Sequence, residues 1–164
     1  MKQQHDLPTF LFEDQAYDLG YKLVVGIDEA GRGPLAGPVV AAACYIDKSF
    51  NVEGIKDSKQ LDPLARKEVY HRLISHPGVK YGIGIVDASI IDTTNILQAT
   101  MQAMLIAISK LPVDPDYLLI DGNCFPKTSL PGLALVKGDE RSLSIAAASI
   151  IAKVTRDNAI ATIN

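Results

Sequence analysis

The sequence is poor in cysteine, and this scarcity excludes two kinds of site. Cys44 and Cys124 are the only cysteines among 164 residues, and neither has a second cysteine or a histidine close to it in the sequence. A structural zinc site needs such a cluster of ligands, and a redox-active pair needs two cysteines at short spacing. We therefore expect two reduced, buried thiols and neither a zinc ribbon nor a redox pair.

Long hydrophobic runs and a strong charge imbalance are also lacking. Residues 1–18 are polar and of mixed charge, and no apolar run reaches the roughly 18 residues that a membrane-spanning helix requires. Sixteen basic and nineteen acidic side chains give a net charge of −3, so any polyanionic partner must be bound by a local group of residues. These absences predict a cytoplasmic protein without a membrane partner. We also expect it to be a monomer.

The sequence does contain enough apolar residues for one core. It is 48% hydrophobic and 21% charged, which is typical of one globular domain. No internal repeat, low-complexity tract or linker divides it, so we expect residues 1–164 to form a single domain. Apolar runs of strand length predict six strands: 21–27, 38–46, 50–55, 79–86, 117–120 and 133–136.

Helical segments alternate with the later strands. Asp62 followed by Pro63 is a helix start signal, and 77–78 (Pro-Gly) is a stop signal. A second helix can be capped by Asp92 or Thr93, and a third is expected from residue 140 onward. Apolar residues at helical spacing predict core faces on the first two helices: Leu64, Val69, Leu73 and Ile74 on one, and Ile96, Leu97, Met101, Met104, Leu105 and Ile108 on the other. Strands followed by alternating helices and strands predict a mixed sheet with helices on its faces, in the α/β class. Gly82 and Gly84 lie in the fourth predicted strand (79–86). Because glycine has no side chain, the backbone of another segment can approach the strand closely there.

Four carboxylates stand at places where predicted strands end or a helix begins. Asp28 and Glu29 follow the first strand, Asp121 follows another, and Asp139 precedes the last helix. In open α/β sheets, ligands collect at the carboxyl ends of strands. Converging carboxylates repel one another unless a cation neutralises them. Oxygen donors without histidine or cysteine favour Mg²⁺ or Mn²⁺ over zinc. A pair of such ions about 4 Å apart can activate water on one side of a phosphodiester and stabilise the leaving oxygen on the other.

Each of these carboxylates also has a plainer interpretation. Asp28 and Glu29 alone are typical of solvated residues at a strand end. Residues 121–123 (Asp-Gly-Asn) are a turn signal. Asp139 could simply cap the helix that follows it.

The segment 26–38 (GIDEAGRGPLAGP) favours the metal site over these plainer interpretations. Its glycines expose backbone N–H groups on a loop with Arg32 at its centre, and such a loop suits phosphate or sugar oxygens. A nucleotide-binding P-loop is excluded, because Arg32-Gly33 stands where that motif requires Lys-Ser or Lys-Thr. Two carboxylates inside the loop would also repel a phosphate without an intervening metal.

With the two valines that follow it, this segment resembles the N-terminal signature of the ribonuclease HII family. Three further blocks agree with that family in the same order: DSKQL (57–61), LIDGN (119–123), and KGD (137–139) running into SIAAASIIAKVTRD (144–157). The resemblance extends from about Tyr21 to Asp157. It implies a ribonuclease-H-like mixed β-sheet flanked by α-helices.

The resemblance also implies a metal-dependent endonuclease that hydrolyses the RNA strand of RNA/DNA hybrids. It implies nicking on the 5′ side of single ribonucleotides embedded in duplex DNA, which leaves 3′-hydroxyl and 5′-phosphate ends and serves DNA replication and repair. By motif position, the implied metal-binding and catalytic carboxylates are Asp28, Glu29, Asp121 and Asp139. Gly31, Arg32 and Gly33 match the loop whose backbone senses the ribose 2′-hydroxyl. Lys59 and Lys153 match basic positions near the substrate strands, and either could also be a solvated surface lysine.

The sequence departs from the family pattern at its end. Members of the family usually continue past the Arg156-Asp157 pair through helical segments and a tyrosine that stacks beside the substrate, whereas this sequence stops at Asn164. We therefore expect a chain that folds but cleaves weakly, with strong salt sensitivity and a blurred preference for the junction. Two alternatives stay open, namely a nucleic-acid-binding domain with little or no catalysis and a ribonuclease HIII relative. Ribonuclease HIII usually has an additional N-terminal substrate-binding domain, and only about twenty residues precede Tyr21 here.

Overall fold

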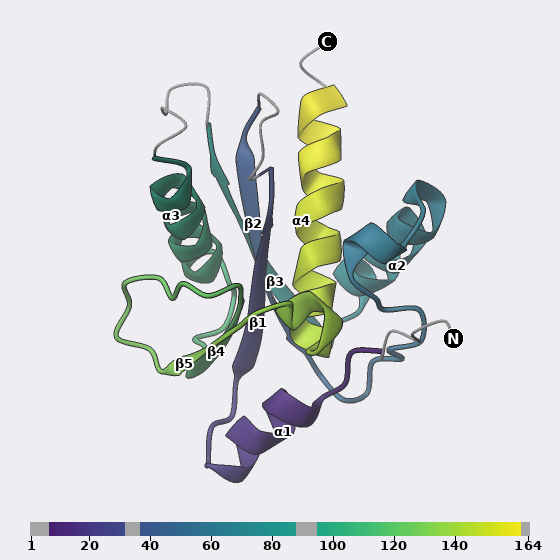
Figure 1. Cartoon of the computed structure of the whole chain (residues 1–164). Coiled ribbons are helices and arrows are strands. Elements are labelled where there is room, and N and C mark those ends of the chain that lie inside the picture. Colours follow the sequence, from purple (N-terminus) through teal and green to yellow (C-terminus); the bar gives the residue numbers. More distant parts are fainter. Residues whose placement is uncertain (1–6, 32–36, 88–94, 162–164) are drawn as a thin grey trace, which may run out of the picture.

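A five-stranded mixed sheet forms the centre of the protein (Figure 1). The computed structural model describes residues 7–31, 37–87 and 95–161. The strands lie in the order β3-β2-β1-β4-β5, with bounds β1 Val24–Ala30, β2 Val39–Ile46, β3 Val79–Val86, β4 Tyr117–Asp121 and β5 Gly132–Leu135. β1 pairs antiparallel with β2 and parallel with β4, and β4 pairs parallel with β5. The carboxyl ends of β1, β4 and β5 therefore lie at one edge of the sheet.

Helices cover both faces of this sheet, which confirms the predicted α/β class (Figure 1). Their bounds are α1 Leu11–Asp18, α2 Pro63–Ser75, α3 Ile96–Ser109 and α4 Leu143–Ala161, with short 3₁₀ turns η1 Ser58–Gln60 and η4 Gly138–Glu140. α4 and α2 pack on one face and α3 packs on the other. Within the described residues, no helix is both long enough and apolar enough to cross a membrane.

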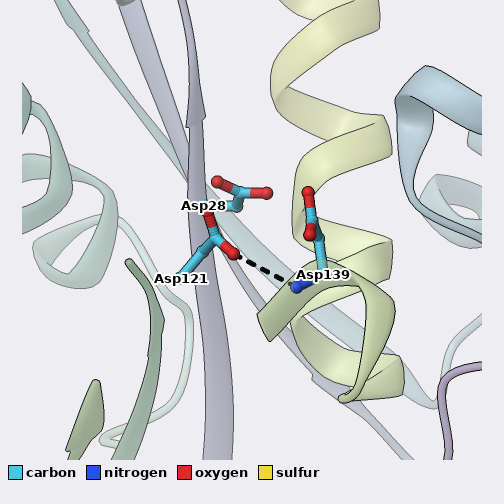
Figure 2. A group of neighbouring side chains, drawn as sticks. All are labelled: Asp28, Asp121 and Asp139. Carbon is cyan, nitrogen blue, oxygen red and sulfur yellow. Dashed lines mark hydrogen bonds between the residues drawn. The ribbon is translucent and has the colours of Figure 1, made fainter. Parts of the chain in front are cut away.

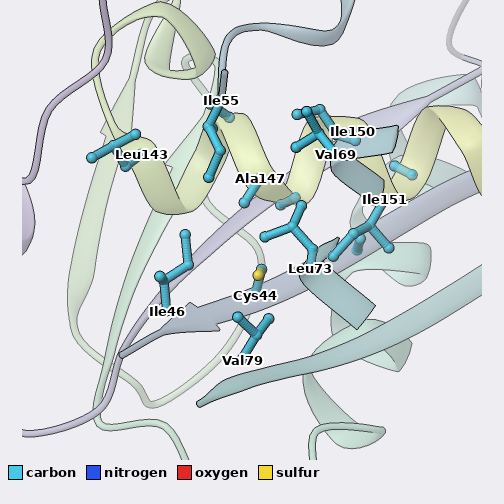
Figure 3. Close-up of a cluster of buried hydrophobic side chains, with 14 of the residues drawn as sticks. Cys44, Ile46, Ile55, Val69, Leu73, Val79, Leu143, Ala147, Ile150 and Ile151 are labelled. Carbon is cyan, nitrogen blue, oxygen red and sulfur yellow. The ribbon is translucent and has the colours of Figure 1, made fainter. Parts of the chain in front are cut away.

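The largest cluster of buried apolar side chains lies between α4, α2 and the sheet (Figure 3). Leu73 of α2 and Ile151 of α4 pack above Cys44 of β2, and all three are fully buried. β1 and β2 are buried on both faces, which explains their almost continuous apolar sequences. The thiol of Cys44 is buried and free, as expected, whereas Cys124 is free but only half-buried.

Glycine brings the helices close to the sheet. A Cβ atom at Gly26 of β1 would overlap the backbone of Ser144 in α4, and Cβ atoms at Gly82 and Gly84 of β3 would overlap backbone carbonyl oxygens of α3. The close approach that Gly82 and Gly84 predict is thus confirmed, and Gly26 provides the same contact on the opposite face. The backbones of α3 and α4 therefore contact the sheet directly, in addition to the packing of their side chains.

The prediction of a strand at 50–55 is wrong. Phe50 and Ile55 are buried in the core, but the segment between them turns at Gly54, whose φ is +85°. The guanidinium of Arg72 donates to the carbonyl oxygens of Asn51 (2.6 Å) and Glu53 (2.9 Å) and so replaces the hydrogen bonds that a neighbouring strand would provide.

Helix predictions need three further corrections. The helix expected from Glu140 starts at Leu143, because residues 138–140 form η4. Leu97 and Leu105, which were expected in the core face of α3, are 37% and 36% exposed, because Ala99, Ala103 and Ala107 with Met104 form the buried face. Leu64 of α2 is also exposed, although Asp62 caps that helix as predicted. Asp92 and Thr93 lie outside the described residues.

The polar N-terminal segment contains α1, which the sequence analysis did not predict. Glu13 of α1 is 1% exposed, and its carboxylate accepts hydrogen bonds from the Ser142 hydroxyl (2.8 Å) and the Ser144 backbone N–H (2.9 Å). Backbone N–H groups at a helix start have no partner within the helix, so an acceptor there stabilises it. Glu13 therefore caps α4 from the opposite end of the chain.

Candidate active site

Three aspartates meet at the sheet edge where the parallel strands end (Figure 2). Asp28 lies near the end of β1, Asp121 is the last residue of β4, and Asp139 lies in η4, which follows β5. One carboxylate oxygen from each residue lies within 4.8 Å of the others. The geometry therefore brings together three of the four carboxylates that the sequence indicates.

The pairing register explains why Asp28 and Asp121 meet. Ile27 pairs with Ile120 across the parallel β1–β4 ladder, so the two aspartates are the next residues of adjacent strands. Alternation along each strand points Ile27 and Ile120 toward the α3 face. The two aspartates consequently point to the opposite face, which α4 covers.

A left-handed residue brings Asp139 to the same place. Lys137 has φ +54°, which bends the chain sharply between β5 and η4. The backbone N–H of Asp139 then donates to Asp121 Oδ1 at 3.2 Å (Figure 2), and the N–H of Glu29 donates to Asp28 Oδ1 at 2.7 Å. These backbone donors fix the orientation of the two strand-end carboxylates.

Asp28 and Asp139 are buried, Asp121 is half-buried, and all three carboxylates lie close together; burial and mutual repulsion both favour the protonated forms. Burial raises the pKa of Asp28 well above its ordinary value, and the charges of Asp121, Glu29 and Asp139 raise it further. Burial, followed by the charges of Asp121 and Asp57, raises the pKa of Asp139 to about 7. At neutral pH the cluster therefore favours protons or a cation, which explains how an acidic cluster is tolerated inside the fold.

A divalent cation that prefers oxygen fits this donor set. Asp28, Asp121 and Asp139 each offer a carboxylate oxygen, and the group contains neither histidine nor cysteine. Mg²⁺ and Mn²⁺ bind carboxylates, whereas zinc sites are typically built with nitrogen or sulfur ligands. These three residues are the ones that would hold the metal.

Glu29, the fourth predicted carboxylate, occupies a different position from the other three. It is not part of the group of three whose oxygens lie within 4.8 Å of one another. It lines the same cleft, and its charge contributes to the raised pKa of Asp28. Neighbouring residues of a strand point to opposite faces, which explains why Glu29 stands apart from Asp28.

Most of the remaining predicted residues line the same open cleft, whose volume is about 280 Å³. Gly31, Lys59 and Lys153 all border it. Lys59 Nζ lies 3.6 Å from both Asp57 Oδ2 and Asp139 Oδ2, whereas Lys153 Nζ lies 3.1 Å from Asp157 Oδ1, one helical turn away. Arg32 and Gly33 lie outside the described residues.

Asp57 is a buried residue of this region that the sequence analysis did not single out. It is 3% exposed, accepts a hydrogen bond from the Lys59 backbone N–H (3.1 Å) and, through its charge, helps to raise the pKa of Asp139. Asp57 begins the DSKQL block, and as an aspartate two positions before Lys59 it has the pattern of a local cap. That pattern predicts the bond to Lys59 but gives no indication of the contact with Asp139.

Comparison with known proteins identifies the family. The family model described as Ribonuclease HII matches residues 25–164. The chain belongs to the ribonuclease HII family. Ribonuclease HII of Chlamydia trachomatis is 52% identical over 147 residues, which cover 90% of this chain and 67% of that protein. The Clostridioides difficile protein is 49% identical over 158 residues, which cover 96% and 62% respectively. The chain is thus a ribonuclease H type 2 enzyme and spans about two thirds of the length of these relatives.

Solved structures confirm the ribonuclease-H-like fold. Ribonuclease H2 from Pyrococcus horikoshii gives a TM-score of 0.71 at 32% identity, over 87% of this chain and 75% of that chain. Ribonuclease HII from Archaeoglobus fulgidus, solved in complex with PCNA, gives 0.67 at 26% identity, over 87% and 76%. A ribonuclease HIII solved with Mn²⁺ has the same fold, with a TM-score of 0.67 at 24% identity over 90% of this chain and 56% of that one. The sequence match favours ribonuclease HII over the ribonuclease HIII alternative.

Proposed function

We propose that this enzyme is a metal-dependent endonuclease that hydrolyses the RNA strand of RNA/DNA hybrids. We further propose that it nicks duplex DNA on the 5′ side of an embedded ribonucleotide and leaves 3′-hydroxyl and 5′-phosphate ends, a reaction of DNA replication and repair. The observation that supports this proposal is the convergence of Asp28, Asp121 and Asp139 at the ends of neighbouring elements in a ribonuclease HII chain.

The carboxylates act in this proposal by holding divalent cations, either Mg²⁺ or Mn²⁺. When bound, such ions activate water and stabilise the leaving oxygen of a phosphodiester. Asp28, Asp121 and Asp139 supply the negative charge, and the backbone N–H of Asp139 keeps the Asp121 carboxylate in place. Glu29 adds a fourth carboxylate at the wall of the same cleft.

The residues around the cleft fit a nucleic-acid substrate. Lys59 and Lys153 offset phosphate charge beside an acidic centre, which matters because the chain has a net charge of −3. Gly31 borders the cleft, so its backbone is available there for a ribose. We assign Gly31, Arg32 and Gly33 to contact with the 2′-hydroxyl, which distinguishes RNA from DNA at one nucleotide.

The decisive experiment uses an end-labelled DNA duplex that contains one ribonucleotide, incubated with the protein and Mg²⁺ or Mn²⁺. We expect one nick on the 5′ side of the ribonucleotide, no nick in the matching all-DNA duplex and no nick in EDTA. Binding of the duplex without a nick in either metal would contradict the proposal and favour the binding-domain alternative.

Asp28→Asn and Asp121→Asn test the assignment of the carboxylates. Each variant removes a metal ligand's charge at constant size, so we expect cleavage to fall by at least about a thousandfold. Circular dichroism should show an unchanged fold, because the removed charge is repelled by its neighbours. Asp114→Asn, in an exposed loop outside the cleft, is the matched control and should retain the activity of the unmodified chain.

A further inference from the structure

The described ends of the connection between β1 and β2 pack against a buried arginine of α4. Arg156 is 5% exposed, and its Nε donates to the carbonyl oxygen of Pro38 at 3.0 Å. A Cβ atom at Gly31 would overlap the same guanidinium, and one at Gly37 would lie 3.3 Å from its NH2 nitrogen. Both ends of the connection therefore pack against one side chain.

The two glycines have backbone conformations that suit this packing. Gly31 has φ +96° and Gly37 has φ +127°, and only glycine adopts such values without strain. Each glycine turns the chain where it meets Arg156, so the guanidinium occupies the space that side chains would otherwise fill. A buried guanidinium is costly unless its donors are paired, and the bond to Pro38 meets part of this requirement.

Within the described residues, Arg156 reaches the cleft through Gly31, which it contacts, and through its own helix. Gly31 lines the cleft, and β1 places Asp28 three residues before it, whereas Arg156 itself is not among the residues that line the cleft. One turn earlier on α4, Lys153 does line it. A displaced guanidinium would thus change where Gly31 stands relative to Lys153 and the carboxylates.

We propose that Arg156 is a positioning residue that fixes the Gly31 end of the β1–β2 connection for substrate binding. This inference rests on the proposed function, because it assigns Gly31 to substrate contact. Arg156 sets the affinity for a ribonucleotide-containing duplex through the backbone of Gly31. It leaves the metal-holding carboxylates unchanged, because they are held by the strand register and by the backbone bonds of Glu29 and Asp139.

Arg156 gives a cleaner test than Gly31. A side chain at Gly31 would collide with both Arg156 and the Pro38 carbonyl, so it would disturb the local fold as well as any approach to a ribose. Arg156→Met keeps the length of the side chain and removes its charge and donors. Arg156→Lys keeps the charge and one donor group.

The experiment measures kcat and KM for nicking a duplex with one ribonucleotide at saturating Mg²⁺, beside calorimetric titration with Mn²⁺. We expect Arg156→Met to raise KM roughly tenfold with kcat changed less than about twofold, and Mn²⁺ affinity to stay the same. Arg156→Lys should raise KM by only about threefold. Arg72→Met is the matched control, because Arg72 also ties a loop by its carbonyl oxygens but lies outside the cleft; its KM should not change.

Several outcomes overturn the inference. Either an unchanged KM in Arg156→Met or equal KM shifts in the Arg156 and Arg72 variants would reduce Arg156 to a purely structural role. If Arg156→Met does not fold, the KM of Arg156→Lys decides, and a value equal to that of the unmodified chain overturns the inference. An unmodified chain that does not nick the duplex in either metal would overturn the proposed function and this inference with it.

Discussion

The two faces of the sheet are built alike but are used differently. On each face, glycine lets a helix backbone rest directly on a strand, through Gly26 under α4 and through Gly82 and Gly84 under α3. The α4 face also buries polar groups, among them Asp28, Ser149 and Arg156. On the other face, α3 buries three alanines and one methionine against apolar side chains of the strands, and the buried hydroxyl of its Thr100 donates to the carbonyl oxygen of Ile96 in the same helix.

One face of the sheet thus contributes mainly to the stability of the fold, whereas the other face also carries the candidate active site. The α3 face requires only complementary packing between helix and sheet, so apolar side chains are sufficient there. The α4 face holds converging negative charges that cost free energy of folding, and it contains the basic and hydroxyl groups that surround them. The alternation of side chains along β1 and β4 decides which face receives the aspartates.

Paired glycine variants would test this comparison with the largest expected effect. Gly26→Ala and Gly84→Ala each force a Cβ atom into helix backbone, so we expect each to lower the free energy of unfolding by about 3 kcal/mol or more in urea denaturation. Cleavage per folded molecule should fall only in Gly26→Ala, because α4 borders the cleft. An equal fall in Gly84→Ala would contradict the functional separation of the two faces.

The pH dependence of stability gives a second test, confined to the α4 face. Asp28 and Asp139 have raised pKa values, so between about pH 4 and pH 7 the folded state binds protons that the unfolded chain has released. Without metal, stability should be higher near pH 5 and should fall as the pH rises toward 8. Thermal denaturation in EDTA measures this.

The variant Asp139→Asn should weaken that pH dependence, because it removes one of the two titrating groups. Asp114→Asn should leave the dependence as it is in the unmodified chain. A melting temperature that rises from pH 5 to pH 8 in EDTA would show that the carboxylates are not destabilised by their burial and mutual repulsion.

The smallest expected effect lies on the outer side of α3. Leu97 is 37% exposed, so Leu97→Ala should lower the free energy of unfolding by at most about 1 kcal/mol and leave cleavage unchanged. Urea denaturation measures the first quantity and the nicking assay the second. A loss of several kcal/mol would show that this side of α3 is covered in solution.

Much of the fold could be predicted because strand and turn signals agree locally. The strand at 79–86 has the predicted bounds, and the helix that Asp62 and Pro63 begin ends before Pro77. The strand predicted at 21–27 begins later, at Val24, because the Asp116 carboxylate accepts the backbone N–H groups of Lys22 and Leu23. Because Asp116 is far from Lys22 and Leu23 in the sequence, no local pattern predicts these hydrogen bonds.

For the candidate site as well, only features with a local sequence signal could be predicted. Asp28, Asp121 and Asp139 were predictable from their places at strand ends and helix starts, because parallel strands place such residues at one edge. The contact of Asp57 with Asp139 and the cap that Glu13 provides were not, since both join segments far apart in sequence. The convergence of three aspartates is confirmed, whereas the catalytic, metal-binding and substrate-binding roles of all the predicted site residues stay predictions.

The cap from Glu13 to Ser144 has a consequence for the order in which the chain acquires its structure. During synthesis α1 and β1 leave the ribosome long before α4 does, yet the Glu13 carboxylate lacks its hydrogen-bond donors and β1 lacks the helix that packs on Gly26 until Ser144 and its neighbours follow. Contacts between such distant segments slow folding. The α4 face of the sheet, and with it the cleft that Asp28 lines, is therefore completed only after Ser144 and its neighbours have been translated.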